Sequence, residues 1–379
     1  MTHANPSNRL VYRPWLHAYA LLLMAGVFLL LIVGGTVTSR GAGMAVPDWP
    51  NTFGHNMFAV PWKLWVNFQA PLAEQRGAFW EHSHRLIGSC VGLLTIGLCL
   101  WLWQTQRDRK WLSRLGFALL LLVIVQGLMG GFRVTENSLF LAFVHGVIGQ
   151  VVFGITVLIA AATSRLWNRL ANAGLRGAGQ RLFPGIRAFS LCMLLLIVVQ
   201  LVLGAWVRHA GAGLAIPDFP TSYGHVLPPI TESSLAKARD AMPNAVERAR
   251  VYSVEQVFIH FIHRAGALVV TVAAFTLVGL VIFRMSNYPE AVIPALTFLG
   301  LIALQVFLGI TVVISGRNPE MATAHQSLGA AVLGVAVWLS ARVHLVSLCQ
   351  NPWAPVRKNE VDEPASQPAA ALISGGATA

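Results

Sequence analysis

Long apolar segments separated by short polar stretches dominate this chain. They lie at 16–38, 86–104, 113–132, 140–162, 187–208, 259–283, 292–314 and 323–346. A helix of about 20 residues crosses a hydrocarbon core of roughly 30 Å. The pattern therefore predicts an all-α polytopic membrane protein with eight transmembrane helices. The first segment is too long for a cleavable signal peptide. A polar, glycine-rich stretch also follows it where a cleavage site would lie.

Composition and charge agree with a membrane location. Hydrophobic residues make up 55% of the chain and charged residues 11%, against about 25% charged in soluble domains. Lysine and arginine gather at the N-terminus, near 105–114, 163–187 and 284–291, and in the C-terminal tail. The positive-inside rule makes these parts cytoplasmic, so we expect an inner-membrane protein with both termini in the cytoplasm. The net charge of +12 mostly reflects this topology. The basic residues are scattered over short loops, which argues against nucleic-acid binding.

Part of the sequence occurs twice. Residues 34–55 read GGTVTSRGAGMAVPDWPNTFGH and residues 204–225 read GAWVRHAGAGLAIPDFPTSYGH, with 11 of 22 positions identical. Each copy contains four apolar segments, an even number, so both copies enter the membrane in the same orientation. We therefore predict a parallel internal repeat, in which two four-helix bundles are related by a pseudo-twofold axis along the membrane normal.

The repeat also defines the expected domains. They are an N-terminal half at 15–162, a cytoplasmic linker at 163–186, a C-terminal half at 187–346 and a disordered cytoplasmic tail at 351–379. Both outer loops, 39–80 and 209–256, begin with the repeated proline-rich sequence, which predicts a fixed turn near the membrane surface. Part of 233–256 reads as a surface helix outside the membrane.

Four repeated histidines lie near the outer ends of the second and fourth apolar segments of each copy. They are His84 and His145 in the first copy, and His263 and His325 in the second. An ionisable group in a membrane span is costly and usually faces a bundle interior. A single histidine would be explained by a helix–helix hydrogen bond, but two per copy at the same depth favour ligand binding. His55 and His225 also repeat, within the proline-rich loops, where a role in loop structure is favoured.

The spacing of these histidines favours haem over zinc. Zinc takes three or four protein ligands, and the spans offer no cysteine cluster or second carboxylate to complete such a set. Two facing imidazoles match a haem, whose ring already supplies four nitrogens. Glycines after each histidine leave room for a flat ring, although close helix packing also explains many of them. Arg85 and Arg264 follow their histidines directly, and either bind haem propionates or extend toward lipid headgroups.

One difference between the copies lies beside the proposed ligands. The first copy reads EHSHR from Glu81, and the second reads HFIHR from His260. Glu81 and His84 are three residues apart and share a helix face, whereas His82 points elsewhere. The asymmetry favours a catalytic carboxylate in the first copy. The alternative is a structural ion pair between Glu81 and Arg85.

Three glutamines recur at one spacing: Gln126, Gln200 and Gln305 each precede a glycine by four residues. We interpret them as donors of hydrogen bonds between helices.

Taken together, these residues resemble the heme A synthase family, bacterial and mitochondrial membrane enzymes that complete the haem of cytochrome oxidase. The likeness covers about residues 15–345. It depends on the GGTVTSRGAGMAVPDWP segment and its second copy, Glu81-x-x-His84-Arg85, His145, His263-Arg264 and His325. Many relatives carry a cysteine pair in the first outer loop, which this sequence lacks, so a thiol-based role is in doubt here.

The resemblance implies a function for each half. A heme b cofactor is expected between His263 and His325, with Arg264 beside it. The substrate heme O is expected near His84, Arg85 and His145, with Glu81 needed for turnover. The implied reaction oxidises the C8 methyl of heme O to a formyl group through successive hydroxylations. Besides lipid, a heme O synthase, oxidase assembly factors and an unidentified electron acceptor are the implied partners.

Three other functions fit parts of the pattern. A di-haem b-type electron carrier linked to quinol would use both histidine pairs without chemistry on the ring, but it needs no carboxylate at Glu81. A haem transporter would have parallel repeats, yet its sites usually lie at the membrane midplane. A purely structural bundle would use all four histidines only as hydrogen-bonding groups.

Overall fold

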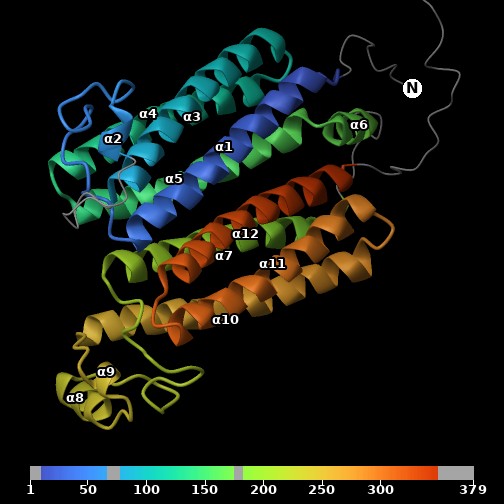
Figure 1. Cartoon of the computed structure of the whole chain (residues 1–379). Coiled ribbons are helices and arrows are strands. Elements are labelled where there is room, and N and C mark those ends of the chain that lie inside the picture. The colour runs from blue at the N-terminus through green and yellow to red at the C-terminus, as the bar shows by residue number, and fades with distance from the viewer. Residues whose placement is uncertain (1–9, 66–76, 175–181, 349–379) are drawn as a thin grey trace, which may run out of the picture.

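The computed structural model describes residues 10–65, 77–174 and 182–348, so the expected tail at 351–379 lies outside the described residues. Within the described part, eight helices are long and apolar enough to cross a membrane (Figure 1). They are α1 (Pro14–Ser39), α3 (Ala78–Thr105), α4 (Lys110–Thr135), α5 (Leu139–Thr163), α7 (Pro184–His209), α10 (Val254–Arg284), α11 (Pro289–Ile314) and α12 (Pro319–Val346). The predicted all-α polytopic fold is confirmed.

The helices extend beyond the apolar segments. Helix α3 begins at Ala78, whereas its apolar segment begins at residue 86, so Glu81 and His84 lie on the helix itself. Polar residues lower the hydropathy there without interrupting the helical backbone hydrogen bonds. Helix α10 likewise begins early, where Ser253 and Gln256 form a capping box that satisfies backbone N–H groups of the first turn.

The long helices form two groups of four that pack on each other (Figure 1). In the first group α1 packs on α3 and α5, and α4 packs on the same two helices. In the second group α7 packs on α10 and α12, and α11 packs on those two. The groups meet where α12 contacts α1 and α5, and where α5 contacts α7. Helix α12 is the most enclosed, with 72% of its apolar stretch buried inside the protein.

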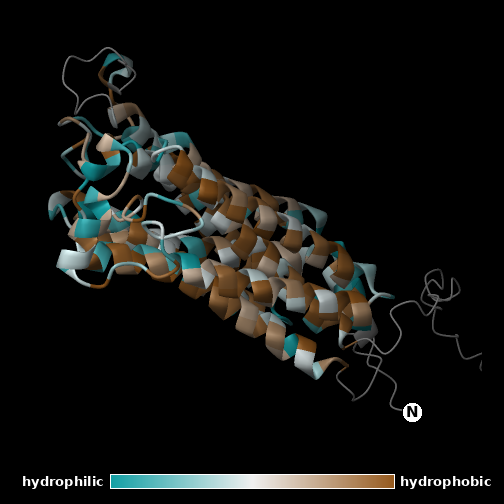
Figure 2. Cartoon of the chain, turned by 90° about the horizontal axis from the view of Figure 1, so that it is seen from below, coloured by the Kyte–Doolittle hydropathy of each residue, from teal (hydrophilic) through white to brown (hydrophobic). Residues whose placement is uncertain are grey.

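Shorter helices lie at the ends of the bundle. The expected linker contains α6 (Arg165–Gly174), and the second outer loop contains α8 (Glu232–Asp240) and α9 (Ala245–Arg248), which confirms the surface helix expected there. The first outer loop contains only one turn, α2 (Trp62–Trp65), within its described part. Figure 2 shows hydrophobic residues along the length of the bundle and many hydrophilic residues at the end that carries these outer loops.

Both outer loops fold alike at the repeated proline-rich sequence. Asp48 accepts hydrogen bonds from the backbone N–H groups of Phe53 and Gly54, both at 2.8 Å, and Asp218 makes the same two bonds in the second loop. Gly54 has a φ of +76°, a left-handed conformation that glycine adopts without steric cost. Burial disfavours the charged form of Asp48, but the N–H groups outweigh this effect and lower its pKa below the usual value. The loop is therefore built around a carboxylate.

Candidate functional site: two pairs of facing histidines

The four repeated histidines form two pairs with nearly equal geometry. His84 on α3 faces His145 on α5, with ring centroids 6.4 Å apart and planes inclined by 75°. His263 on α10 faces His325 on α12, with centroids 6.5 Å apart and planes inclined by 89°. Each pair joins the second and fourth long helices of one group. The pairing expected from the sequence is therefore present in both halves.

The separation of the rings fits two imidazoles on opposite sides of one metal ion. Two metal–nitrogen bonds of about 2 Å each, together with the radii of two five-membered rings, span such a distance. No cluster of three or more His, Cys, Asp or Glu side chains able to hold a metal ion occurs among the described residues. A metal between each pair would thus need a ligand that supplies the remaining donors, and a haem does so.

The surroundings of Nδ1 fit this arrangement. Nδ1 of His84, of His145 and of His325 is buried. Backbone carbonyls of the neighbouring helices, at Leu30, Gln126 and Gln305, lie against these rings. When the Nε2 atom of a histidine binds a metal, Nδ1 carries the proton and is normally oriented by an acceptor. We therefore assign metal binding to Nε2.

Each imidazole packs against a glycine of the neighbouring helix. A Cβ atom built on the glycine would lie close to Cε1 of the ring, at 2.8 Å for Gly34 and His84, 3.3 Å for Gly130 and His145, 3.1 Å for Gly204 and His263, and 3.0 Å for Gly309 and His325. Any side chain there would push the ring away. The sequence analysis considered the glycines that follow each histidine on its own helix. The glycines that contact the rings lie instead on the long helix that precedes each histidine-bearing helix.

Three of the glycine-bearing helices also hydrogen-bond to the histidine that they face. The Nε2 atom of Gln126 donates to the backbone carbonyl of His145 at 3.0 Å. Gln200 makes the same bond to His263 at 2.9 Å, and Gln305 makes it to His325 at 3.0 Å. The predicted helix–helix hydrogen bonds of the glutamines are thereby confirmed. Each amide joins the backbone of one proposed ligand to the helix beside it.

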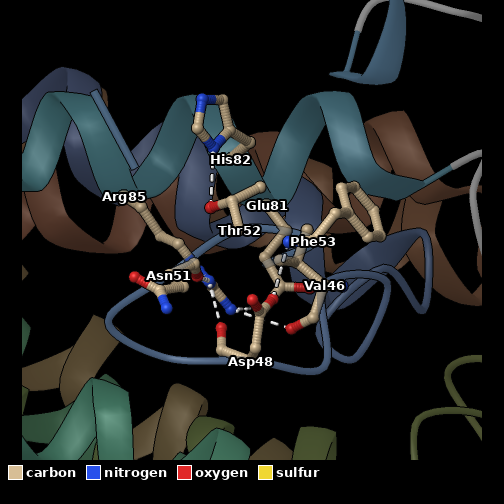
Figure 3. A network of polar contacts seen from close by, with 8 residues as sticks. All are labelled: Val46, Asp48, Asn51, Thr52, Phe53, Glu81, His82 and Arg85. Atoms are coloured by element: carbon tan, nitrogen blue, oxygen red, sulfur yellow. Dashed lines mark hydrogen bonds and ion pairs between the residues drawn. The ribbon is translucent and has the colours of Figure 1, made fainter. Parts of the chain in front are cut away.

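Glu81 lies at the junction between α3 and the first outer loop (Figure 3). It is 4% exposed, and its Oε2 atom accepts a hydrogen bond from the backbone N–H of Val46 at 3.0 Å. Its Oε1 atom pairs with Nη2 of Arg85 at 3.0 Å. The ion pair considered as the structural alternative is thus present. These contacts set the direction of a buried carboxylate that lies one helical turn before His84.

Arg85 holds the first outer loop in place (Figure 3). Its Nη1 atom donates to the carbonyls of Asp48 at 2.6 Å and Asn51 at 2.9 Å, and its Nη2 atom donates to that of Val46 at 2.9 Å. Arg264 makes the same three kinds of contact in the second loop. Both guanidinium groups therefore donate to loop carbonyls, a role that neither alternative from the sequence included.

The second half places a histidine where the first half has Glu81. Nδ1 of His260 accepts from the backbone N–H of Ile216 at 3.2 Å, which corresponds to the bond between Val46 and Glu81. The two side chains thus serve the same loop contact, but only the first half has a carboxylate. His82 packs on the first loop as well, with its Nδ1 atom 3.2 Å from Oγ1 of Thr52 (Figure 3).

The repeated loop histidines contribute through their backbones. His55 pairs with Thr52, and His225 pairs with Ser222, in short antiparallel bridges, and both histidine side chains are exposed. This agrees with the role in loop structure that the sequence favoured for them.

Two arginines near the sites were not singled out from the sequence. Arg133 on α4 interacts electrostatically with Glu81, His84 and His145, and a Cβ on Gly43 would collide with its guanidinium. The available signal for it was a charge directly after the predicted span 113–132. Arg133 places a positive charge beside the first histidine pair.

Arg208 on α7 connects the two halves. Its Nη2 atom donates to the carbonyl of Gly35 at 2.5 Å and to Oγ of Ser39 at 2.7 Å, both on α1. Oγ1 of Thr323, two residues before His325, donates to the same Ser39 oxygen at 2.9 Å. The outer end of α1 is therefore bound by residues of α7 and α12.

Comparison with known proteins supplies the family. A protein-family model described as "Cytochrome oxidase assembly protein" matches residues 17–337. The chain belongs to this family. The match runs from α1 to α12, so both histidine pairs lie within the part of the chain that this family of cytochrome oxidase assembly proteins shares.

Several curated relatives carry the name Heme A synthase. The protein of Chelativorans sp. (strain BNC1) is 25% identical over 366 residues, which cover 90% of this chain and 94% of the relative. That of Methylobacterium radiotolerans is 28% identical over 346 residues, covering 86% and 88%. That of Methylobacterium nodulans is 29% identical over 341 residues, covering 85% and 89%. The expected membership of the heme A synthase family is confirmed.

Proposed function

We propose that this protein is a heme A synthase, which oxidises the C8 methyl of heme O to a formyl group through successive hydroxylations. The observation that carries the proposal is the presence of two equivalent histidine pairs, of which only the first has a buried carboxylate beside it. Two equal sites would suit two haems that only carry electrons. Here the sites differ: the site beside Glu81 suits the reaction centre, and the site beside His260 suits an electron relay.

The residues divide between the two haems accordingly. His84 and His145 hold the substrate heme O, and His263 and His325 hold a resident heme b. When bound, heme b supplies an electron acceptor within the membrane. Arg85 and Arg264 act through the loops that they hold. Arg133 is the cation that we assign to the carboxylates of the substrate haem, because its charge acts on both histidines of the first pair.

Glu81 handles the proton released at the substrate. Oxidation of a methyl C–H bond releases a proton, and a carboxylate held one helical turn from His84 is placed to accept it. The Val46 N–H and the Arg85 guanidinium keep the carboxylate from rotating away, because each binds a different oxygen. A carboxylate in this position also stabilises positive charge that develops on the ring.

Localisation and partners follow from the same proposal. Both termini lie in the cytoplasm and the histidine pairs lie toward the outer side of the inner membrane. The substrate comes from a heme O synthase, and the product passes to cytochrome oxidase and its assembly factors. We also propose that the two halves, 15–162 and 187–346, are parallel repeats with the same orientation in the membrane.

Haem extraction tests the proposed function. Cells that supply heme O should contain heme A when they express the wild-type chain. A Glu81→Ala variant should retain haem b in its absorption spectrum and yield no heme A. Formation of heme A by the variant would contradict the role of Glu81. Wild-type cells with unchanged heme b and no heme A would instead support the di-haem electron carrier.

A further inference from the structure

We infer that His84 is the one releasable axial ligand of the protein, because the helix that faces it lacks the glutamine that secures the other three histidines. The inference rests on the proposed function, since it takes all four histidines as ligands of haem iron. It goes further in assigning opposite mechanical roles to the two ligands of the substrate haem.

Three of the four ligand-facing helices carry the same two-residue unit. On α4, α7 and α11 a glutamine precedes by four residues the glycine that packs against the imidazole. Each glutamine Nε2 atom donates to the backbone carbonyl of its histidine at 2.9 or 3.0 Å. The ligand is thereby tied to a second helix and not only to its own.

Gln200 also contacts the ring of its histidine. Its Nε2 atom lies 3.0 Å from Nδ1 of His263. The Oε1 atoms of Gln126, Gln200 and Gln305 are buried and have no hydrogen-bond partner among the described residues. A hydrogen-bonding group beside Nδ1 orients the ring of a metal-binding histidine, and a leucine side chain offers none.

Helix α1 lacks this unit. Leu30 precedes Gly34 by four residues, as Gln200 precedes Gly204 at the corresponding place in the second half. A leucine side chain neither donates nor accepts a hydrogen bond. The Leu30 carbonyl faces the His84 ring, as the carbonyls of Gln126 and Gln305 face theirs. What His84 lacks is the side-chain amide that ties the backbone carbonyl of the other three histidines to the neighbouring helix.

The glutamine is missing at the haem site where a reaction would need an open coordination position. Iron bound by two imidazoles has no open coordination position, and both ligands of the resident haem are secured, by Gln200 and Gln305. The substrate haem has one secured ligand, His145, and one unsecured ligand. With a haem bound, release of His84 would leave the electron pair on its Nε2 atom and would open a position for water or another small molecule, without transfer of an electron.

Release of His84 also places the vacancy beside the proposed base. His84 and Glu81 are three residues apart on α3 and lie on one face of the helix. The same asymmetry between the halves thus appears twice, once in the carboxylate at position 81 and once in the missing glutamine at position 30. The two observations are independent, because one lies on α3 and the other on α1.

Carbon monoxide binding to the reduced, haem-loaded protein tests the inference. The wild type should bind carbon monoxide at the haem of the N-terminal half and not at that of the C-terminal half. A Leu30→Gln variant should bind it about 10-fold more weakly or more slowly, the lower end of the effect of such supporting hydrogen bonds. Leu30→Met, which adds no hydrogen-bonding amide, should behave as the wild type.

The reciprocal variant tests the same idea in the other half. Gln200→Leu should give the C-terminal haem a carbon monoxide complex that the wild type lacks. If Leu30→Gln fails to retain its haem, carbon monoxide binding by Gln200→Leu alone tests the inference. Carbon monoxide binding unaffected by both substitutions would overturn the inference. Heme A content is measured in the same cells, so that a wild type without heme A reports failure of the proposed function separately.

Discussion

Gly34 lies so close to His84 that a Cβ atom on the glycine would come within 2.8 Å of Cε1 and 3.2 Å of Nδ1 of the imidazole. Contacts between real Cβ atoms and neighbouring atoms do not become this short, so the ring would have to move. The glycine thus sets the position of a proposed iron ligand from the helix beside it.

Substitution of this glycine should displace the ligand. We predict that Gly34→Ala lowers haem occupancy of the N-terminal half, because overpacking a close contact costs about 1–3 kcal/mol. Gly204→Ala should have the same effect on the C-terminal haem. The measurement is the haem-to-protein ratio after purification. Gly279→Ala is the control, since a Cβ on Gly279, far along α10 from His263, would meet no atom within 4 Å.

The two roles of Glu81 can be separated with the residue that the second half uses. We predict that Glu81→His retains the loop contact to Val46, as His260 retains the contact to Ile216, while heme A formation falls by at least about 100-fold. Haem content and heme A yield are measured together. His260→Glu is the control and should leave heme A formation largely intact. Full activity of Glu81→His would restrict the carboxylate to holding the loop.

The contact between Arg208 and α1 should stabilise the packing of the two halves. We predict that Arg208→Ala lowers the free energy of unfolding in detergent by about 1.5–3 kcal/mol, the range for a hydrogen bond to a charged group. A double-mutant cycle with Ser39→Ala should show coupling. Arg40→Ala removes an exposed ion pair with Glu320 and should cost at most about 1 kcal/mol. Equal losses from both arginines would contradict the prediction.

The aspartates of the outer loops should make stability depend on pH. Burial alone would raise the pKa of Asp48 and Asp218, but hydrogen bonds to the carboxylates lower both below the usual value of about 3.9. A lowered pKa stabilises the folded state above the unfolded pKa, and this contribution is lost as the pH falls through the folded value. Asp218→Asn should therefore lower thermal stability at pH 7 and lower it less near pH 3. A loss of equal size at both pH values would argue against the charge.

Much of the fold and of the site could be predicted from the sequence. Apolar segments indicated the membrane helices, and duplication marked the paired histidines, because residues that repeat at one depth lie on corresponding helices. The three glutamines followed from spacing alone. Hydropathy alone placed the start of α3 too late, because it falls at Glu81 while the backbone hydrogen bonds continue, whereas the spacing of Glu81 and His84 correctly placed both on one helix.

Contacts between distant parts of the chain could not be predicted in this way. Arg85 was expected to face propionates or lipid, yet its donors meet carbonyls of a loop that folds back over the helix end. Arg208 joins α7 to α1 across the boundary between the halves, and no local pattern encodes that approach. In both cases the tertiary position of a loop or helix end decides which acceptors a long side chain reaches.

The way the two halves meet has a consequence for how their chemistry diverged. Contacts of α12 with α1 and of α5 with α7 are the equivalent pair that a symmetric dimer of one four-helix subunit would form. In such a dimer every substitution appears twice, so both centres must change together. Joining the subunits in one polypeptide removes that constraint. Arg208 on α7 can then contact α1 without an arginine at the equivalent position of the first half. Likewise, the first half can have Leu30 where the second half keeps Gln200.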